Sequence, residues 1–342
     1  MRSMPKQIYW SSNFPFGIAD IENESHLKYK IGCENSFLAE DSIHCCIAEC
    51  NNWLVRVRRG TNDANSFCKT HGIRLSTRPT YIYDDKFRNI IIAHDLYSSA
   101  INKKVENWRL GNENSEDAVT WNVFVSFMKA RMLDYLFETI VGEPPSEYPK
   151  LYLWGSQISE EGVFEFAELS RIRSDLEKGL SIPTEPDIAI VVPGQAAVLI
   201  EAKFGSKNPT LEGKEERRGD IHEFLDRYYC SPDLPDPLKR SWLIDLPSSQ
   251  IYEQLCRNAI FASWIASFTG GKKAILINLV RSEDELDIEA RLSRNINQDG
   301  IIFKRITWEE LYKLAINYRS LLNPLGDNMK NKSYCLQKAL KI

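Results

Sequence analysis

The sequence predicts an α/β protein, with a central mixed sheet flanked by helices and an added β-rich region at the N-terminus. Three observations lead to this expectation. Residues 1–107 contain short apolar runs without a sustained helical period. From residue 111 onward, helical patterns alternate with short apolar runs that suit buried strands. The chain has 342 residues, enough for one core and an additional unit.

Composition is that of an ordinary globular protein and excludes several other classes. Hydrophobic residues make up 43% and charged residues 26%, unlike disordered, collagen-like or coiled-coil chains. The net charge of −4 argues against a polycation that coats nucleic acid, although a local basic groove stays compatible with it. No apolar run approaches membrane-spanning length, and no secretory signal is visible. We therefore expect a cytoplasmic protein with no membrane partner and with reduced cysteines.

Two candidate hairpins account for the β-rich N-terminal region. Apolar runs at 43–48 and 53–58 flank an Asn-Asn pair at 51–52, which is typical of a β-hairpin. Runs at 81–83 and 89–92, around an Asp-Asp pair, repeat the pattern less clearly. We expect this region to recognise a substrate or a partner.

Cysteine and histidine residues gather in the same region, at His44, Cys45, Cys46, Cys50, Cys68 and His71. Cys46-x3-Cys50 and Cys68-x2-His71 are near-acceptable spacings for two pairs of structural zinc ligands. Buried cysteine also behaves as a small apolar residue, and strand alternation places Cys46 and Cys50 on the same face as His44. The sequence therefore favours reduced, buried thiols over a structural zinc site.

The second unit, expected at residues 108–320, begins with a helix. Apolar residues recur at steps of three and four from Ala118 to Leu136, which predicts one amphipathic helix of about seven turns. It should end before the Gly-Glu-Pro-Pro segment that starts at residue 142. Apolar runs at 188–192 and 196–200 then surround Pro-Gly-Gln and predict a buried hairpin.

A charged, proline-containing insertion at about 205–248 separates this hairpin from the remaining elements. Those elements are a helix at 251–268, strands at 274–280 and 301–306, and a final helix that opens on the capping box Thr307–Glu310. Residues 321–342 form a Lys/Asn-rich tail that we expect to be frayed.

The hairpin carries the most informative polar residues of the chain. If its strands pair symmetrically about Gly194, Asp187 lies opposite Glu201, with Cβ atoms about 5 Å apart. Glu201 and Lys203 are two residues apart and share one face of a strand. The three side chains would then meet on one patch, and a bulge would shift this register by one residue.

Two close carboxylates repel unless positive charge lies between them. Lys203 supplies one charge, and a divalent cation with a preference for oxygen, such as Mg²⁺, would supply the rest. Such a site can activate water at a phosphodiester. The alternative is an ion pair of Glu201 and Lys203 on a solvated face. The apolar neighbours of Glu201 argue against that, because an unpaired charge in apolar surroundings is expensive.

Pro186-Asp187 followed by Glu201-Ala202-Lys203 resembles the PD-(D/E)XK signature of the restriction-endonuclease-like nuclease superfamily. The resemblance covers roughly residues 111–315. It implies a restriction-endonuclease-like core and Mg²⁺-dependent cleavage of DNA, or less often RNA, with Mn²⁺ as a possible substitute. It also implies that Asp187, Glu201 and the carbonyl of Ala202 bind metal and that Lys203 is catalytic.

The same resemblance suggests two further site residues. Many members carry an acid on the helix before the hairpin, for which Glu116 is the first choice and Glu113 and Asp117 are alternatives. Glu116 could instead be a first-turn acid that favours the helix dipole. Some members carry a glutamine on the following helix, a place that Gln254 could fill, although the residue types alone favour a plain surface residue there.

Two basic clusters are candidate contacts for nucleic acid. One consists of Arg56, Arg58 and Arg59, and the other, in the charged insertion, of Lys207, Lys214, Arg217 and Arg218. Both could instead be ordinary solvated segments. DNA is the expected partner, with RNA as the alternative, and a homodimer would suit cleavage of two strands. The rival hypotheses are a non-catalytic nucleic-acid- or protein-binding module on a nuclease-like fold, and an enzyme of another phosphoryl reaction.

Overall fold

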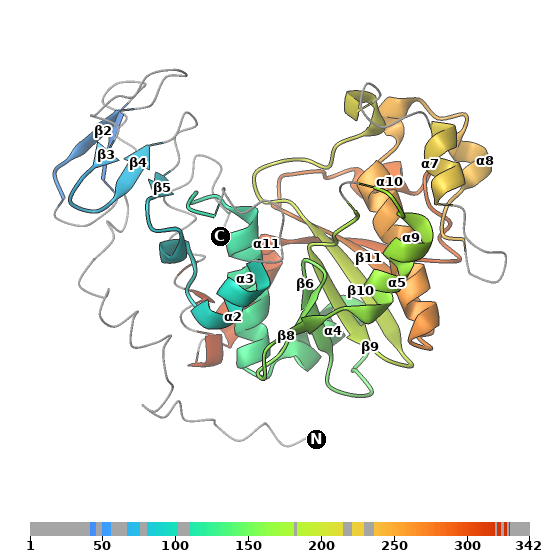
Figure 1. The fold of residues 1–342 in the computed structure, drawn as a ribbon, viewed down its shortest axis with the longest axis horizontal. Helices are drawn as coiled ribbons and strands as arrows, with labels where there is room; N and C mark the ends of the chain where they lie inside the picture. Colours follow the sequence, from blue (N-terminus) through green and yellow to red (C-terminus); the bar gives the residue numbers. More distant parts are fainter. Residues whose placement is uncertain are drawn as a thin grey trace.

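The computed structural model describes residues 42–45, 50–55, 67–75, 81–101, 110–180, 183–214, 221–228, 236–318, 320–322, 325–326 and 328. A seven-stranded mixed sheet forms its centre (Figure 1). The strands are β6 (Lys150–Leu153), β7 (Ser156–Ile158), β8 (Val163–Glu165), β9 (Ile188–Val192), β10 (Ala196–Ala202), β11 (Lys273–Val280) and β12 (Ile302–Thr307).

The order of strands across the sheet is β12-β11-β10-β9-β6-β7-β8. β10, β11 and β12 run parallel to one another, and every other pair of neighbours is antiparallel. The predicted α/β class with a mixed sheet between helices is confirmed. The strands at 274–280 and 301–306 are confirmed as β11 and β12.

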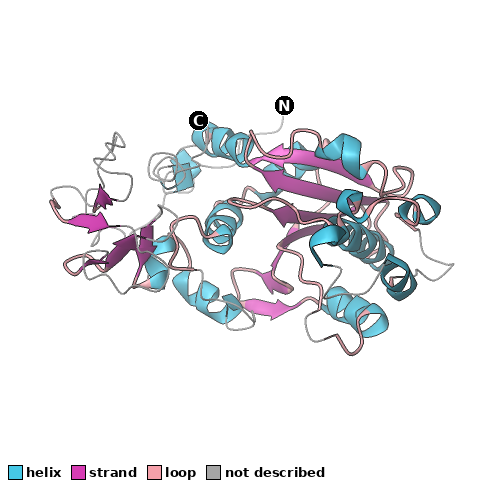
Figure 2. Ribbon diagram, turned by 90° about the horizontal axis from the view of Figure 1, so that it is seen from above, coloured by secondary structure: helices cyan, strands magenta, loops and turns pink. Residues whose placement is uncertain are grey.

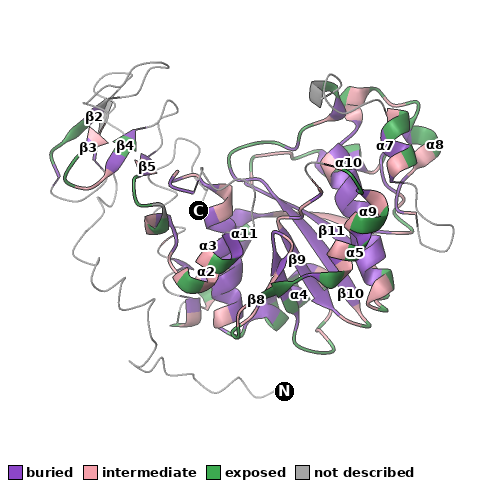
Figure 3. Ribbon diagram, in the orientation of Figure 1, coloured by how far each residue is buried: buried purple, intermediate pink, exposed green. Residues whose placement is uncertain are grey.

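Helices cover both faces of the sheet, as Figure 2 shows from above. Even-numbered residues of β9 and β10 pack with α2 (His94–Ile101), α3 (Glu116–Lys129), α4 (Leu133–Val141) and α11 (Trp308–Asn317). Odd-numbered residues pack with α5 (Ala167–Leu176), α7 (Ile221–Arg227), α9 (Glu253–Phe268) and α10 (Ile288–Leu292). The central strands are buried throughout (Figure 3), which explains why they read as continuous apolar runs.

The hairpin of β9 and β10 has the predicted register. Val192 pairs with Ala196 and Ile188 pairs with Ile200, so the strands turn symmetrically about Gly194. Gly194 has φ +73°, a left-handed conformation that glycine adopts without steric cost. The register places residues 187 and 201 one position beyond the last pair, at the same end of the hairpin.

Several other elements differ from the prediction. The single long helix is wrong, because α3 and α4 are separated by Ala130–Met132, where Arg131 has φ +58°. This left-handed residue turns the chain, so that apolar residues of both helices enter the same core. The segment at 150–176, for which no elements were predicted, forms β6, β7, β8 and α5.

Later elements agree more closely with the sequence. The helix at 251–268 is α9, and Thr307 with Glu310 forms the predicted capping box at the start of α11. The charged insertion contains η3 (Leu211–Lys214), α7 and α8 (Arg240–Leu243). Five residues of the tail at 321–342 are described, and Leu322 and Leu325 among them are buried in the core beside α11, so the start of the tail is not frayed. The rest of the tail lies outside the described residues.

The described N-terminal strands form two small sheets at one end of the molecule (Figure 1). They are β1 (Ser42–His44), β2 (Trp53–Val55), β3 (Phe67–Cys68), β4 (Ile73–Leu75) and β5 (Tyr81–Tyr83). The hairpin around the Asn-Asn pair is confirmed as β1–β2. The second hairpin is wrong, because β5 pairs with β4 and is followed by the 3-10 helix η2 (Lys86–Asn89).

Side-chain packing places the end of the N-terminal unit before residue 107, the boundary predicted from the sequence. Side chains from Cys45 to Tyr83 form a small separate core, whereas Ile90 and the buried face of α2 join the core of the large sheet. The N-terminal unit is therefore the strand region alone, and the chain enters the larger unit at about residue 90.

The second edge of β5 binds the loop that precedes α3. The Tyr83 N–H donates to the Gly111 carbonyl over 2.8 Å, and the Glu113 N–H donates to the Tyr81 carbonyl over 2.9 Å. Ile82 and Asn112 form an antiparallel bridge between these bonds. The N-terminal unit is thereby fastened directly beside the first turn of α3.

Replacing Gly111 with alanine is expected to loosen this attachment. A Cβ at this position would lie 2.6 Å from the Tyr83 carbonyl oxygen, so the backbone of one segment must move. We expect the free energy of unfolding to fall by about 1–3 kcal/mol, measured by urea denaturation. Gly300→Ala is the matched control, because its Cβ would make only ordinary contacts of 3.5 Å or more. Equal stability of the two variants would contradict the attachment.

Within the described residues, no helix combines the length and apolar character needed to cross a membrane.

Candidate active site

Asp187, Glu201 and Lys203 meet where β10 leaves the sheet. Asp187 directly precedes β9, and its Oδ2 accepts a hydrogen bond of 3.0 Å from the N–H of Ala202. Glu201 is the second-last residue of β10, and Lys203 follows the strand. Glu201 is an odd-numbered residue of β10 and therefore belongs to the sheet face that α9 covers.

Glu201 is fully buried and both of its carboxylate oxygens have partners. One oxygen pairs with the Nζ of Lys203. The other accepts a hydrogen bond of 2.8 Å from the Nδ2 of Asn258 on α9. A carboxylate without contact to water requires such partners, because an unpaired buried charge is very unfavourable.

Lys203 is held by its backbone as well as its side chain. Its N–H donates to the Leu279 carbonyl over 2.8 Å, and its carbonyl accepts from the Trp308 indole over 3.1 Å. Burial disfavours the charge on the amine, but the carboxylates of Glu201, Asp187 and Glu116 outweigh burial and raise the pKa of Lys203 above its usual value.

Glu116 reaches the same lysine from the opposite helical layer. Ser115 caps α3, which makes Glu116 the first residue of the helix. Its Oε2 accepts a hydrogen bond of 2.8 Å from the N–H of Phe204, and its Oε1 lies 3.9 Å from the Nζ of Lys203. Burial raises the pKa of Glu116 to about 7, with opposition from Lys203 and reinforcement from Asp187.

The two alternatives to Glu116 lie elsewhere. Glu113 is buried, and its carboxylate accepts a hydrogen bond from the hydroxyl of Tyr83, which fastens the N-terminal unit. Asp117 is half-buried, and its charge adds to the increase in the pKa of Glu116. Among the three acids near the start of α3, Glu116 is the one whose described ion pair reaches Lys203.

The amide that contacts Glu201 is that of Asn258, which the sequence reasoning missed. Gln254 lies in the first turn of α9 and is half-buried. Asn258 is one helical turn further on, on the same helix face, and is the residue that donates to Glu201. Projecting the helix from Gln254 by one turn would have identified it.

Replacing Asn258 with alanine should destabilise the metal-free protein. The change removes a donor from a fully buried carboxylate, so we expect the free energy of unfolding to fall by about 1.5–3 kcal/mol in urea denaturation. Gln254→Ala, on the same face of the same helix, should change it by less than about 0.5 kcal/mol. A larger effect at Gln254 would reverse this assignment of the amide.

A second polar group, also missed from the sequence, lies on the neighbouring strand. Asn278 of β11 is the register partner of Glu201 and is fully buried. Its side chain accepts from Asn208 over 2.8 Å and donates to Glu285 over 2.7 Å. These bonds fasten the chain that leaves Lys203 to β11, and so stabilise the edge of the candidate site.

The predicted basic contacts are only partly described. Lys207 is exposed four residues after Lys203, and Lys214 ends η3. Arg217 and Arg218 lie outside the described residues, as do Arg56, Arg58 and Arg59. These nucleic-acid contacts therefore stay predictions.

The chain matches no family model, no curated protein and no solved structure. The functional argument therefore depends on the residues and geometry of the site itself.

Proposed function

We propose that the chain is a metal-dependent nuclease of the PD-(D/E)XK type, which hydrolyses phosphodiester bonds with DNA as the favoured substrate. The observation that carries the proposal is the meeting of Asp187, Glu201 and Glu116 around Lys203 at the end of β10. The α/β architecture supports it, because hairpin β9–β10 presents the acids between two helical layers.

The balance of charge supports a divalent cation at this site. Three ionised carboxylates around one ammonium group leave two negative charges uncompensated. In the absence of metal, burial and the neighbouring acid make the charged form of Glu116 unfavourable, as its raised pKa indicates. Carboxylate and carbonyl oxygens are the ligands that Mg²⁺ prefers, and Mn²⁺ accepts the same set. The donor set therefore fits such an ion.

In this proposal, Asp187, Glu201, Glu116 and the carbonyl of Ala202 hold the metal. A bound Mg²⁺ would activate water and stabilise negative charge on the phosphate and the leaving oxygen. Lys203 provides a compact positive charge that orients the attacking water or holds the phosphate. Asn258 positions the carboxylate of Glu201 through the bond to its second oxygen.

The direct test is incubation of the purified full-length chain with plasmid, linear duplex, single-stranded DNA and RNA. Each substrate is combined with Mg²⁺, Mn²⁺ or EDTA. We expect cleavage with either metal and none with EDTA, and preference for DNA over RNA. Binding without cleavage of any substrate would favour a nucleic-acid-binding module and would overturn the proposal.

A further inference from the structure

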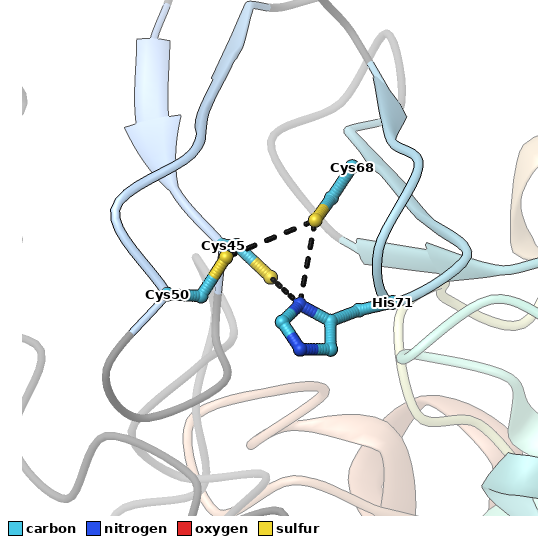
Figure 4. A group of neighbouring side chains, drawn as sticks. All are labelled: Cys45, Cys50, Cys68 and His71. Carbon is cyan, nitrogen blue, oxygen red and sulfur yellow. Dashed lines mark hydrogen bonds between the residues drawn. The ribbon is translucent and has the colours of Figure 1, made fainter.

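Four side chains of the N-terminal unit converge on one point (Figure 4). We call Cys45, Cys50, Cys68 and His71 the Cys₃His cluster. Cys45 and Cys50 come from the loop between β1 and β2, Cys68 is the last residue of β3, and His71 lies in the turn between β3 and β4. The sulfur and nitrogen atoms of the cluster all lie within 4.8 Å of one another, and the three cysteines are buried.

Three distances between ligand atoms of the cluster match those of a tetrahedral zinc site. With Zn–S of about 2.3 Å and Zn–N of about 2.0–2.1 Å, ligand atoms lie about 3.8 Å (S to S) and 3.5 Å (S to N) apart. The Sγ atoms of Cys50 and Cys68 are 3.8 Å apart. The Nδ1 of His71 lies 3.6 Å from the Sγ of Cys45 and 3.4 Å from that of Cys68.

Neighbouring groups hold these ligand atoms in place. The Nδ2 of Asn52 donates to the Sγ of Cys68 over 3.2 Å, a bond that stabilises negative charge on sulfur. The N–H groups of His71 and Gly72 both donate to the Cys68 carbonyl, and Gly72 has φ +62°. This tight turn brings the cysteine and the histidine of the Cys-x2-His segment to the same side.

The apolar core described for the N-terminal unit is small. Among the residues that the structure describes, it consists of eight side chains, three of which are the cysteines of the cluster. Small cores are commonly supplemented by disulfides, a metal or association. None of the four described cysteines forms a disulfide. A metal ion is therefore the stabilising element that the residues can supply.

We propose that the Cys₃His cluster binds one structural zinc ion. Thiolate and imidazole ligands select zinc over the oxygen-preferring cations of the candidate active site. Four protein ligands close the tetrahedron, which is the arrangement of a structural rather than a catalytic zinc. The proposal reverses the preference drawn from the sequence, and it does not depend on nuclease activity.

The first test measures metal in the full-length chain. After dialysis against a weak chelator, elemental analysis should find about one zinc per chain. Exchange with Co²⁺ should produce the visible absorption of tetrahedral cobalt together with sulfur-to-cobalt charge transfer in the near ultraviolet. The charge-transfer band identifies the cluster, because the acids around Lys203 provide no sulfur. A chain without zinc and without this spectrum overturns the proposal.

Variants then separate the ligands from other buried cysteines. Cys68→Ser should reduce zinc to less than about 0.1 per chain. Cys256→Ser is the control, because Cys256 is fully buried on α9 and outside the cluster, and it should retain the metal. Equal loss of zinc in the two variants contradicts the assignment.

Variants of His71 test its role as a ligand through the absorption of bound cobalt, and not only through the stability of the protein. His71→Ala should lose zinc, whereas His71→Cys should retain it and strengthen the sulfur-to-cobalt band, since a fourth thiolate replaces imidazole. Failure of His71→Cys to bind Co²⁺ more tightly than His71→Ala overturns the role of His71. A zinc-free chain with a mass 2 Da lower, indicating a disulfide, overturns the whole proposal.

Discussion

Replacing Asp187 with asparagine is expected to reduce metal-dependent cleavage by about 10³-fold or more, while stability hardly changes. Asparagine retains an oxygen that can accept the hydrogen bond from the Ala202 N–H, so the local backbone should hold. The lost charge weakens attraction to Lys203 and also relieves repulsion of Glu116. These effects oppose each other, and the free energy of unfolding of the metal-free protein should change by less than about 1 kcal/mol.

The measurement compares cleavage rates and urea denaturation for Asp187→Asn and for Asp175→Asn, an exposed aspartate on α5. Asp175→Asn should retain wild-type cleavage. An active Asp187→Asn protein would exclude Asp187 as a metal ligand, and a strongly destabilised one would show that its role is structural.

Replacing Lys203 with methionine should have two large effects. Cleavage should fall by about 10³-fold or more, because the charge that orients water or holds the phosphate is lost. The metal-free protein should also lose about 3–5 kcal/mol of stability, because the fully buried Glu201 loses its cationic partner. Asp187→Asn and Lys203→Met therefore differ in stability although both should be inactive.

A double variant separates the two effects of the lysine. Lys203→Met combined with Glu201→Gln removes both charges, so stability should recover in part while cleavage stays absent. Lys207→Met is the control for stability, because Lys207 is exposed, and it should unfold like the wild type. If Lys203→Met unfolds like Lys207→Met, the ion pair with Glu201 has no structural importance.

The sequence was most informative where one strong pattern decided the structure. Two apolar runs around Gly194 determined the register of β9 and β10, because the short turn between them fixes which residues of the hairpin pair. The relative positions of Asp187, Glu201 and Lys203 followed from that register. The sequence also placed Glu116 on the helix before the hairpin, and the structure begins α3 at this residue, with Ser115 as its cap.

Other features depend on tertiary packing, which the sequence pattern does not show. β6, β7 and β8 are only three or four residues long, so no period could be recognised, and they exist as additions to the edge of β9. The break at Arg131 carries neither glycine nor proline, and so gave no signal in an apolar helical pattern. Gln254 and Asn258 share one face of a helix, and which of them contacts Glu201 depends on how α9 packs on β10.

The cysteine region shows where a simple rule fails. The Cys46-x3-Cys50 spacing suggested Cys46 as a ligand, whereas the structure brings Cys45 to Cys50, Cys68 and His71, and Cys46 lies outside the described residues. Strand alternation favoured buried thiols instead. β1 ends at His44, so the alternation no longer applies at Cys45.

The pairing of β5 with residues 111–113 has a consequence for synthesis of the chain. β5 leaves the ribosome before its second partner exists, and an open strand edge invites incorrect pairing. All four residues of the Cys₃His cluster precede β5, so a zinc ion can complete the N-terminal unit before the large sheet is made. A unit completed in this way would offer the open edge of β5 to residues 111–113, which directly precede the helix turn that carries Glu116.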